Sequence, residues 1–210
     1  MEISIKAMVL GMVATNCYIV SNDETKEAVI IDPADAPERI EAYLLQKQLK
    51  PVGILLTHGH FDHIMAVDAL RDRYGIKVWV SENDHKLMQD TEQNGCYMIG
   101  RIVNVKGDCM VSDGDQIVLG GMMFDVLFTP GHTWGGVCYY MPQADKLFTG
   151  DTLFEGSVGR TDLPTGSMSQ LIQSIKGKLL ANFDDSVEVL PGHGASTTIG
   201  FEKKYNPYLS

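Results

Sequence analysis

The chain has 210 residues, of which 44% are hydrophobic and 21% are charged, and its formal net charge is −10. This composition fits a single folded domain over residues 1–210 and excludes a disordered or collagen-like chain. The acidic charge disfavours nucleic acid as a partner, and no apolar run is long enough to span a membrane.

The first half of the chain alternates between predicted strands and helices. Strands are predicted at 3–10, 17–21 and 27–31, and a helix at 37–48 has Pro37 in its first turn. The continuous apolar run 52–56 predicts a strand buried on both faces, and helical spacing follows at 64–74 before a strand at 77–80.

The second half is rich in strands from 116 to 148, with a turn at Gly120-Gly121. An amphipathic helix is predicted at 167–180 with Ser167 as its N-cap, followed by a strand at 187–190 and a short helix at 197–205. This order of elements predicts a layered α/β protein with sheets inside and helices outside.

The cysteines carry no pairing pattern. Four are scattered along the chain without a Cys-x-x-Cys spacing, and the first twenty residues lack the basic start and long apolar run of a signal peptide. We therefore expect free thiols and a cytoplasmic protein.

Histidines are concentrated where apolar segments end. Three of the six lie within six residues, in the run His58-Gly-His60-Phe-Asp62-His63, directly after the predicted strand at 52–56. Three further residues follow apolar segments in the same way, each behind a glycine: His132, Asp151 and His193. The ends of neighbouring strands in layered α/β proteins form a common crevice, so these side chains are expected to meet.

Imidazole and carboxylate groups of this kind suit zinc, iron or manganese. Seven such residues exceed the needs of one four-coordinate zinc, but they suit two metal ions about 3.5–4 Å apart that share a bridging carboxylate. We therefore predict two divalent ions, with zinc as the first choice and iron or manganese as alternatives. The sixth histidine, His85, lies outside this pattern and is interpreted as an ordinary structural residue.

This pattern resembles the metallo-β-lactamase superfamily, and the resemblance covers nearly the whole chain. It implies a four-layer αβ/βα sandwich with the site at one edge between two sheets. It also implies a set of metal ligands. His58, His60 and His132 would hold one ion, Asp62, His63 and His193 would hold the other, and Asp151 would bridge them.

Within the superfamily the chain looks more like the glyoxalase II (hydroxyacylglutathione hydrolase) branch than the zinc β-lactamases, which usually have Cys or Ser in place of Asp151. Gly150-Asp151-Thr152-Leu153-Phe154 and Gly159-Arg160-Thr161-Asp162 are similar to short bacterial glyoxalase II-like proteins. The likeness places Arg160 at a basic glutathione contact, and we expect it to bind substrate. Asp162 and Ala195 stand where the family has tyrosines, and only 17 residues follow His193, so no separate C-terminal helical substrate domain is expected.

The predicted activity is hydrolysis of small-thiol thioesters such as S-lactoylglutathione. Two metal ions that share a water lower its pKa towards about 7, which makes hydroxide available to attack the carbonyl carbon. Asp62 could serve as both ligand and proton acceptor, and the good leaving ability of a thiolate removes the need for a side-chain nucleophile.

Three alternatives remain open from the sequence. One is an iron-dependent persulfide dioxygenase, in which a single iron is held by residues matching His58, His132 and Asp151. Another is a lactonase or phosphodiesterase. The third is a metal-binding module without activity, which the open ligand set disfavours because structural zinc sites are usually closed. Residues 87–107 are interpreted either as a lid over the site or as a connection, and the oligomeric state is not encoded in any pattern.

Overall fold

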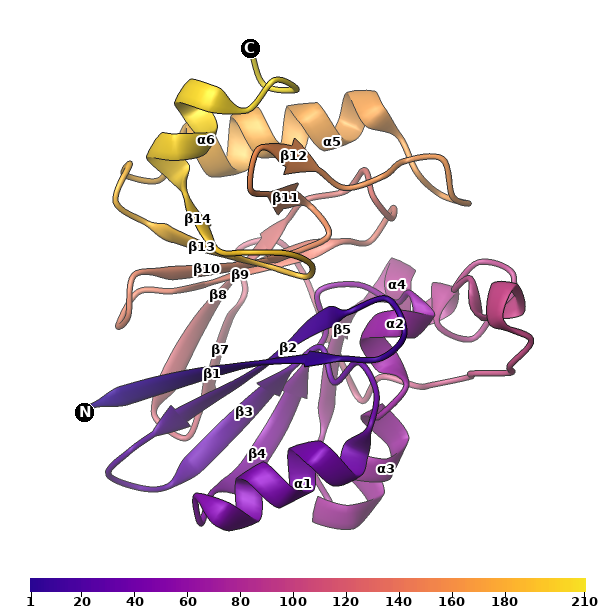
Figure 1. Ribbon diagram of the computed structural model, residues 1–210, viewed down its shortest axis with the longest axis vertical. Helices are drawn as coiled ribbons and strands as arrows, with labels where there is room; N and C mark the ends of the chain where they lie inside the picture. The colour runs from indigo at the N-terminus through magenta and orange to yellow at the C-terminus, as the bar shows by residue number, and fades with distance from the viewer.

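Two six-stranded sheets pack face to face in the computed structural model, which describes residues 1–210 (Figure 1). In spatial order the first sheet contains β1 (Ile3–Leu10), β2 (Thr15–Asn22), β3 (Glu27–Ile31), β4 (Lys50–Leu55), β5 (Val78–Ser81) and β6 (Cys109–Val111). The second contains β14 (Thr197–Thr198), β13 (Glu188–Pro191), β10 (Lys146–Gly150), β9 (Val137–Met141), β8 (Met122–Phe128) and β7 (Gln116–Leu119).

Strand direction changes within each sheet. In the first sheet β1, β2 and β3 are antiparallel, whereas β3 to β6 run parallel. In the second sheet only β10 and β13 are parallel neighbours. The parallel strands β3, β4 and β5 therefore end at the same edge, and the loops that follow them come together there.

Helices cover the outer face of each sheet. Figure 1 shows α1 (Pro37–Gln46) and α3 (Val67–Tyr74) below the first sheet, with α5 (Met168–Ser174) and α6 (Ile199–Tyr205) above the second. A π-helical segment, η2 (Ile175–Leu180), continues α5. The predicted four-layer αβ/βα sandwich is confirmed. No helix has both the length and the apolarity that a membrane crossing requires.

Three apolar cores hold the layers together. One lies between the first sheet and its helices and includes Ile40 and Leu70. The central core lies between the sheets and includes Phe124 and Phe148, both fully buried. The third, which includes Leu171, lies between the second sheet and its helices. Burying an aliphatic or aromatic side chain contributes about 1.5–3 kcal/mol, so these cores supply the main stabilisation.

Several helix predictions need correction. The single helix expected at 64–74 is two helices, α2 (Phe61–Ile64) and α3, because the Ala66 amide donates to the Pro33 carbonyl at 3.0 Å. The helix expected at 37–48 ends at Gln46. Ser167 is at the N-cap position of α5 but makes no side-chain capping hydrogen bond.

Other short elements were not predicted. These are α4 (Glu82–Leu87), the 3-10 helix η1 (Cys96–Ile99), β6 and the hairpin of β11 (Leu153–Phe154) with β12 (Ser157–Val158). The segment expected as a helix at 197–205 begins with β14, and Thr198 then caps α6 by accepting from the Phe201 amide at 3.2 Å.

Candidate metal centre

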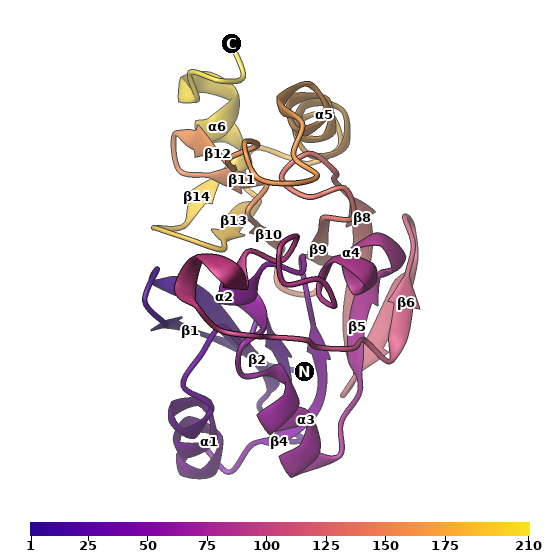
Figure 2. The ribbon, with the colours of Figure 1, turned by 90° about the vertical axis from the view of Figure 1, so that its right-hand side faces the viewer.

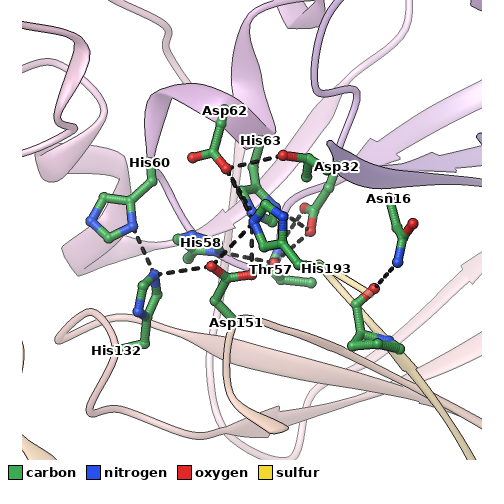
Figure 3. Close-up of polar contacts among 12 residues, drawn as sticks. Asn16, Asp32, Thr57, His58, His60, Asp62, His63, His132, Asp151 and His193 are labelled. Carbon is green, nitrogen blue, oxygen red and sulfur yellow. Dashed lines mark hydrogen bonds and ion pairs between the residues drawn. The ribbon is translucent and has the colours of Figure 1, made fainter. Parts of the chain in front are cut away.

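All seven predicted metal-ligating residues converge where strands of the two sheets end (Figure 3). His58 and His60 follow β4, and α2 places Asp62 and His63 one turn further on. His132, Asp151 and His193 follow β8, β10 and β13, which are strands of the second sheet. The site is therefore assembled from both halves of the chain.

Six of these residues form two groups with the geometry of a metal site. The ligand atoms of His58, His60 and His132 all lie within 4.8 Å of one another. The same limit holds for Asp62, His63 and His193, which form the second group. We call these the first triad and the second triad, and their membership matches the two ligand sets that the resemblance implies.

Asp151 lies between the two triads. Its Oδ1 is 3.4 Å from His63 Nε2, and its Oδ2 is 3.5 Å from both His132 Nε2 and His193 Nε2. One carboxylate thus contacts the first triad through His132 and the second through His63 and His193. This is the position that a bridging ligand between two ions requires.

Buried polar atoms at the centre have no hydrogen-bond partner. They are Nε2 of His58 and His63 together with Oδ1 of Asp151, while His60 turns its Nδ1 towards His132 Nε2 at 2.8 Å. A buried polar atom without a partner costs about 1–3 kcal/mol, so three of them in one cluster are unfavourable unless another group binds there. Divalent ions would satisfy imidazole nitrogens and carboxylate oxygens together, and the residues present fit such ions.

Neighbouring groups fix the orientation of three imidazoles. His63 Nδ1 is 3.0 Å from Asp32 Oδ2, and His132 Nδ1 is 2.7 Å from the Arg160 carbonyl oxygen. His58 Nδ1 is 3.1 Å from Thr57 Oγ1, whose own proton is donated to Asp32 at 2.6 Å. In each case Nδ1 is engaged with an outer partner, so Nε2 is the ring atom that remains for an ion at the centre.

Asp32 is a functional residue that the sequence analysis did not identify. Its carboxylate is 2% exposed and also accepts from the Thr57 amide at 2.8 Å. The sequence contained a signal, because Asp32 follows the apolar strand β3 just as Asp151 follows β10. In the sequence it was interpreted only as the end of that strand.

Asp32→Asn is expected to weaken metal binding at the second triad by about 10–100-fold, because the amide no longer holds His63 as a carboxylate does. Competition with a chromophoric chelator measures this affinity. Asp72→Asn is the matched control, since Asp72 is 79% exposed and contacts Arg71 rather than a candidate metal ligand. An affinity equal to that of the unaltered protein would show that Asp32 does not position His63.

Asp84 is a second residue that the sequence analysis missed, because α4 itself was not predicted. Its fully buried carboxylate accepts from the Gly59 amide at 2.8 Å and from Thr133 Oγ1 at 2.9 Å. Burial raises the pKa of Asp84 to about 6, although these two donors oppose the rise. Asp84 thereby ties the loop that carries His58 to the loop that carries His132.

The two triads differ in protonation. Burial lowers the pKa of His58 well below its ordinary value and that of His60 to about 3, and neighbouring imidazoles add to both effects. In the second triad burial also lowers the pKa of His63, but the Asp62 and Asp151 carboxylates outweigh it and raise that pKa well above its ordinary value. Burial is likewise outweighed at His193, whose pKa rises to about 9 through Asp151 and Asp62.

Metal binding to the metal-free protein should therefore release protons from one triad only. At pH 7 the first triad is already neutral, whereas His63 and His193 are protonated and must lose about two protons when an ion binds. Affinity at the second triad should rise with pH up to about 9, the pKa of His193. Calorimetry in buffers of different ionisation enthalpy measures the release, and equal release at both binding steps would contradict this assignment.

A pocket of about 520 Å³ opens beside the centre. Arg160 is in its wall, but Arg160 Nε and Nη2 are 2.7 and 2.8 Å from the two carboxylate oxygens of Asp162. Residues 87–107 contribute Asn94, Met98 and Ile99 to the wall, and they pass beside α2 (Figure 2). The Phe61 amide donates to the Asn94 carbonyl at 2.8 Å, which joins this segment to α2.

Comparisons with known proteins agree with this geometry. The model of the family described as Metallo-beta-lactamase superfamily matches residues 10–193. Hydroxyacylglutathione hydrolase GloC of Haemophilus influenzae is 37% identical over 93% of this chain and 92% of its own length. The solved BLEG-1 B3 metallo-beta-lactamase is 40% identical, with a TM-score of 0.94 over 99% of this chain and 100% of its own. TTHA1623 in a di-iron-bound form is 37% identical, with a TM-score of 0.85 over 97% of this chain and 100% of its own.

Proposed function

This chain belongs to the metallo-beta-lactamase superfamily and is a metal-dependent hydrolase, and from this membership we propose that it hydrolyses thioesters of small thiols at a centre of two metal ions. The observation that carries the proposal is the Asp151 carboxylate, whose two oxygens lie 3.4–3.5 Å from nitrogens of both triads. The choice of thioesters is supported by the glyoxalase II-like motifs and by the 37% identity to GloC.

The chain's own residues divide the work. His58, His60 and His132 would hold one ion, and Asp62, His63 and His193 would hold the other. When bound, the two ions supply hydroxide near neutral pH and polarise a carbonyl group. We propose zinc for both positions, with iron as the alternative that the di-iron form of TTHA1623 supports.

We propose that Asp62 accepts a proton during the reaction. Its Oδ2 accepts a hydrogen bond from Thr15 Oγ1 at 3.0 Å, and its side chain is 15% exposed in the pocket wall. Burial opposes ionisation of Asp62, but His63 and His193 outweigh it and lower the pKa of the carboxyl group. Asp62 is therefore ionised at neutral pH, as a proton acceptor must be.

A second candidate activity is hydrolysis of β-lactams. Its support is the likeness to BLEG-1, which is named a B3 metallo-beta-lactamase and matches this chain over its full length. Both classes of substrate offer a carbonyl carbon to the same hydrolytic centre. Direct comparison of the two substrate classes is therefore part of the test.

The test uses the protein purified with its metal and follows loss of the thioester absorbance of S-D-lactoylglutathione. A chromogenic β-lactam and oxygen uptake with glutathione persulfide are measured on the same sample. The proposal predicts thioester hydrolysis that a chelator abolishes and that exceeds turnover of the β-lactam. Oxygen uptake without thioester hydrolysis would identify a persulfide dioxygenase instead.

A further inference from the structure

The pocket beside the metal centre has apolar walls. Seven of its fifteen lining residues are hydrophobic. They are Val13, Phe61, Met98, Ile99, Phe154, Val158 and Leu163. Several of these come from elements absent from the sequence predictions, namely η1 and the hairpin β11–β12. An apolar group of a ligand would gain most of its binding energy from such walls.

The polar groups of the wall outside the triads are largely occupied. Asn94 is fully buried, and its amide donates to the Met88 and Val103 carbonyls at 3.1 and 2.8 Å. Its Oδ1 accepts from the Cys96 amide at 2.9 Å. Arg160 is the only lysine or arginine among the lining residues, and its exposed guanidinium is already paired with Asp162 through two hydrogen bonds. Outside the candidate metal ligands, the wall therefore offers a ligand no cation that lacks a partner.

The exposed rim of the pocket includes apolar side chains beside the Arg160–Asp162 pair. Val13, in the turn between β1 and β2, and Met98, in η1, both line the pocket and are 46% and 48% exposed. Their chain neighbours Met12 and Tyr97 are 73% and 55% exposed. A ligand that extends out of the pocket past Val13 and Met98 would thus meet hydrophobic surface.

These features disfavour a carrier thiol that bears carboxylates, as glutathione does. Glutathione bears two carboxylates, and a carboxylate that leaves water needs a cation or several donors to compensate. The wall supplies a single guanidinium, which Asp162 already pairs, and the chain carries a net charge of −10. We propose, on the basis of the thioesterase function above, that the substrates are thioesters of an apolar acyl chain on a thiol without carboxylates near the sulfur.

Binding of uncleavable thioethers tests this substrate class without relying on turnover. Calorimetry with the metal-loaded protein compares S-hexyl-N-acetylcysteamine, S-methyl-N-acetylcysteamine and S-hexylglutathione. The hexyl chain should tighten binding about tenfold or more over methyl on the same thiol. The neutral hexyl compound should bind at least as tightly as S-hexylglutathione. Tighter binding of the glutathione compound, or no gain from the hexyl chain, would overturn the proposal.

Variants of the wall and the ion pair sharpen the test. Asp162→Asn frees Arg160 and should improve binding of S-hexylglutathione about threefold, with no gain for the neutral compound. Met98→Ser should reduce the advantage of hexyl over methyl. Val118→Ser, which removes an exposed apolar side chain on β7 outside the pocket, should leave that advantage intact. Equal effects of Met98→Ser and Val118→Ser would contradict an acyl site at this wall.

Turnover separates failure of this inference from failure of the proposed function. Hydrolysis of S-hexanoyl-N-acetylcysteamine with higher kcat/KM than S-D-lactoylglutathione is the expected result. The reverse order would overturn the substrate class and leave the thioesterase function in place. Hydrolysis of neither compound by fully loaded protein would overturn both.

Discussion

Asp151→Asn is expected to lower kcat/KM for thioester hydrolysis about a thousandfold. The amide is nearly the same size as the carboxylate, but it lacks the charge that faces nitrogens of both triads at 3.4–3.5 Å. A metal ion contributes several kcal/mol of transition-state stabilisation, and the loss of about 4 kcal/mol corresponds to a thousandfold fall in rate. Steady-state kinetics together with metal analysis measure both losses on one sample.

The matched control for this variant is Asp72→Asn, which makes the same chemical change on an exposed side chain of α3. We expect it to keep full metal content and full activity. Two bound ions and near-normal turnover in Asp151→Asn would show that Asp151 does not bridge the centre.

Gly131→Ala is expected to destabilise the fold by about 3 kcal/mol, through overpacking and backbone strain combined. Gly131 has φ of 141°, which disfavours any side chain, and an added Cβ would lie 2.3 Å from the backbone nitrogen of Leu171 in α5. Its carbonyl also accepts from the Ser167 amide at 2.7 Å. The turn that presents His132 thus packs closely against α5. Urea unfolding of the metal-free protein measures the loss in the free energy of unfolding.

Gly177→Ala provides the control for a glycine replacement. Gly177 is in η2, has no positive φ, and an added Cβ would meet nothing within 4 Å. The alanine should leave stability unchanged or raise it by about 0.5 kcal/mol, since it restricts the unfolded chain. If both variants lost stability equally, the close packing of Gly131 on α5 would not be the cause.

The sequence predicted the layered fold and the cluster of candidate ligands because both depend on local patterns. Apolar segments that stop just before one of the predicted ligands occur four times, and parallel strands bring such ends to one edge. His58 and His193 are far apart in the chain, yet both could be assigned to the same site by this rule. The membership of the two triads came from the family resemblance.

What the sequence missed depends on contacts between distant segments. Asp32 orients His63 across 31 positions of the chain, and Asp84 joins Gly59 to Thr133 across 25 and 49 positions. No periodicity signals such contacts. The break between α2 and α3 has the same origin, because Ala66 bonds to Pro33 rather than continuing one helix. The short elements β6, β11 and β12 contain only two or three residues each, too few to show a pattern.

The substrate side was the least accessible from sequence. Arg160 was expected to contact substrate, and the structure places it in the pocket wall with its guanidinium paired to Asp162. That pairing changes the chemistry that the wall offers, since a neutralised arginine attracts a carboxylate weakly. A pair only two residues apart is visible in the sequence, but its position at the pocket depends on the fold.

The two-metal centre is tested most directly by titrating the metal-free protein with zinc while thioester hydrolysis and bound zinc are followed together. Activity should reach its plateau only when two zinc ions are bound per chain. Full activity with one bound ion, or two bound ions without hydrolysis, would contradict the proposed hydrolytic centre of two metal ions.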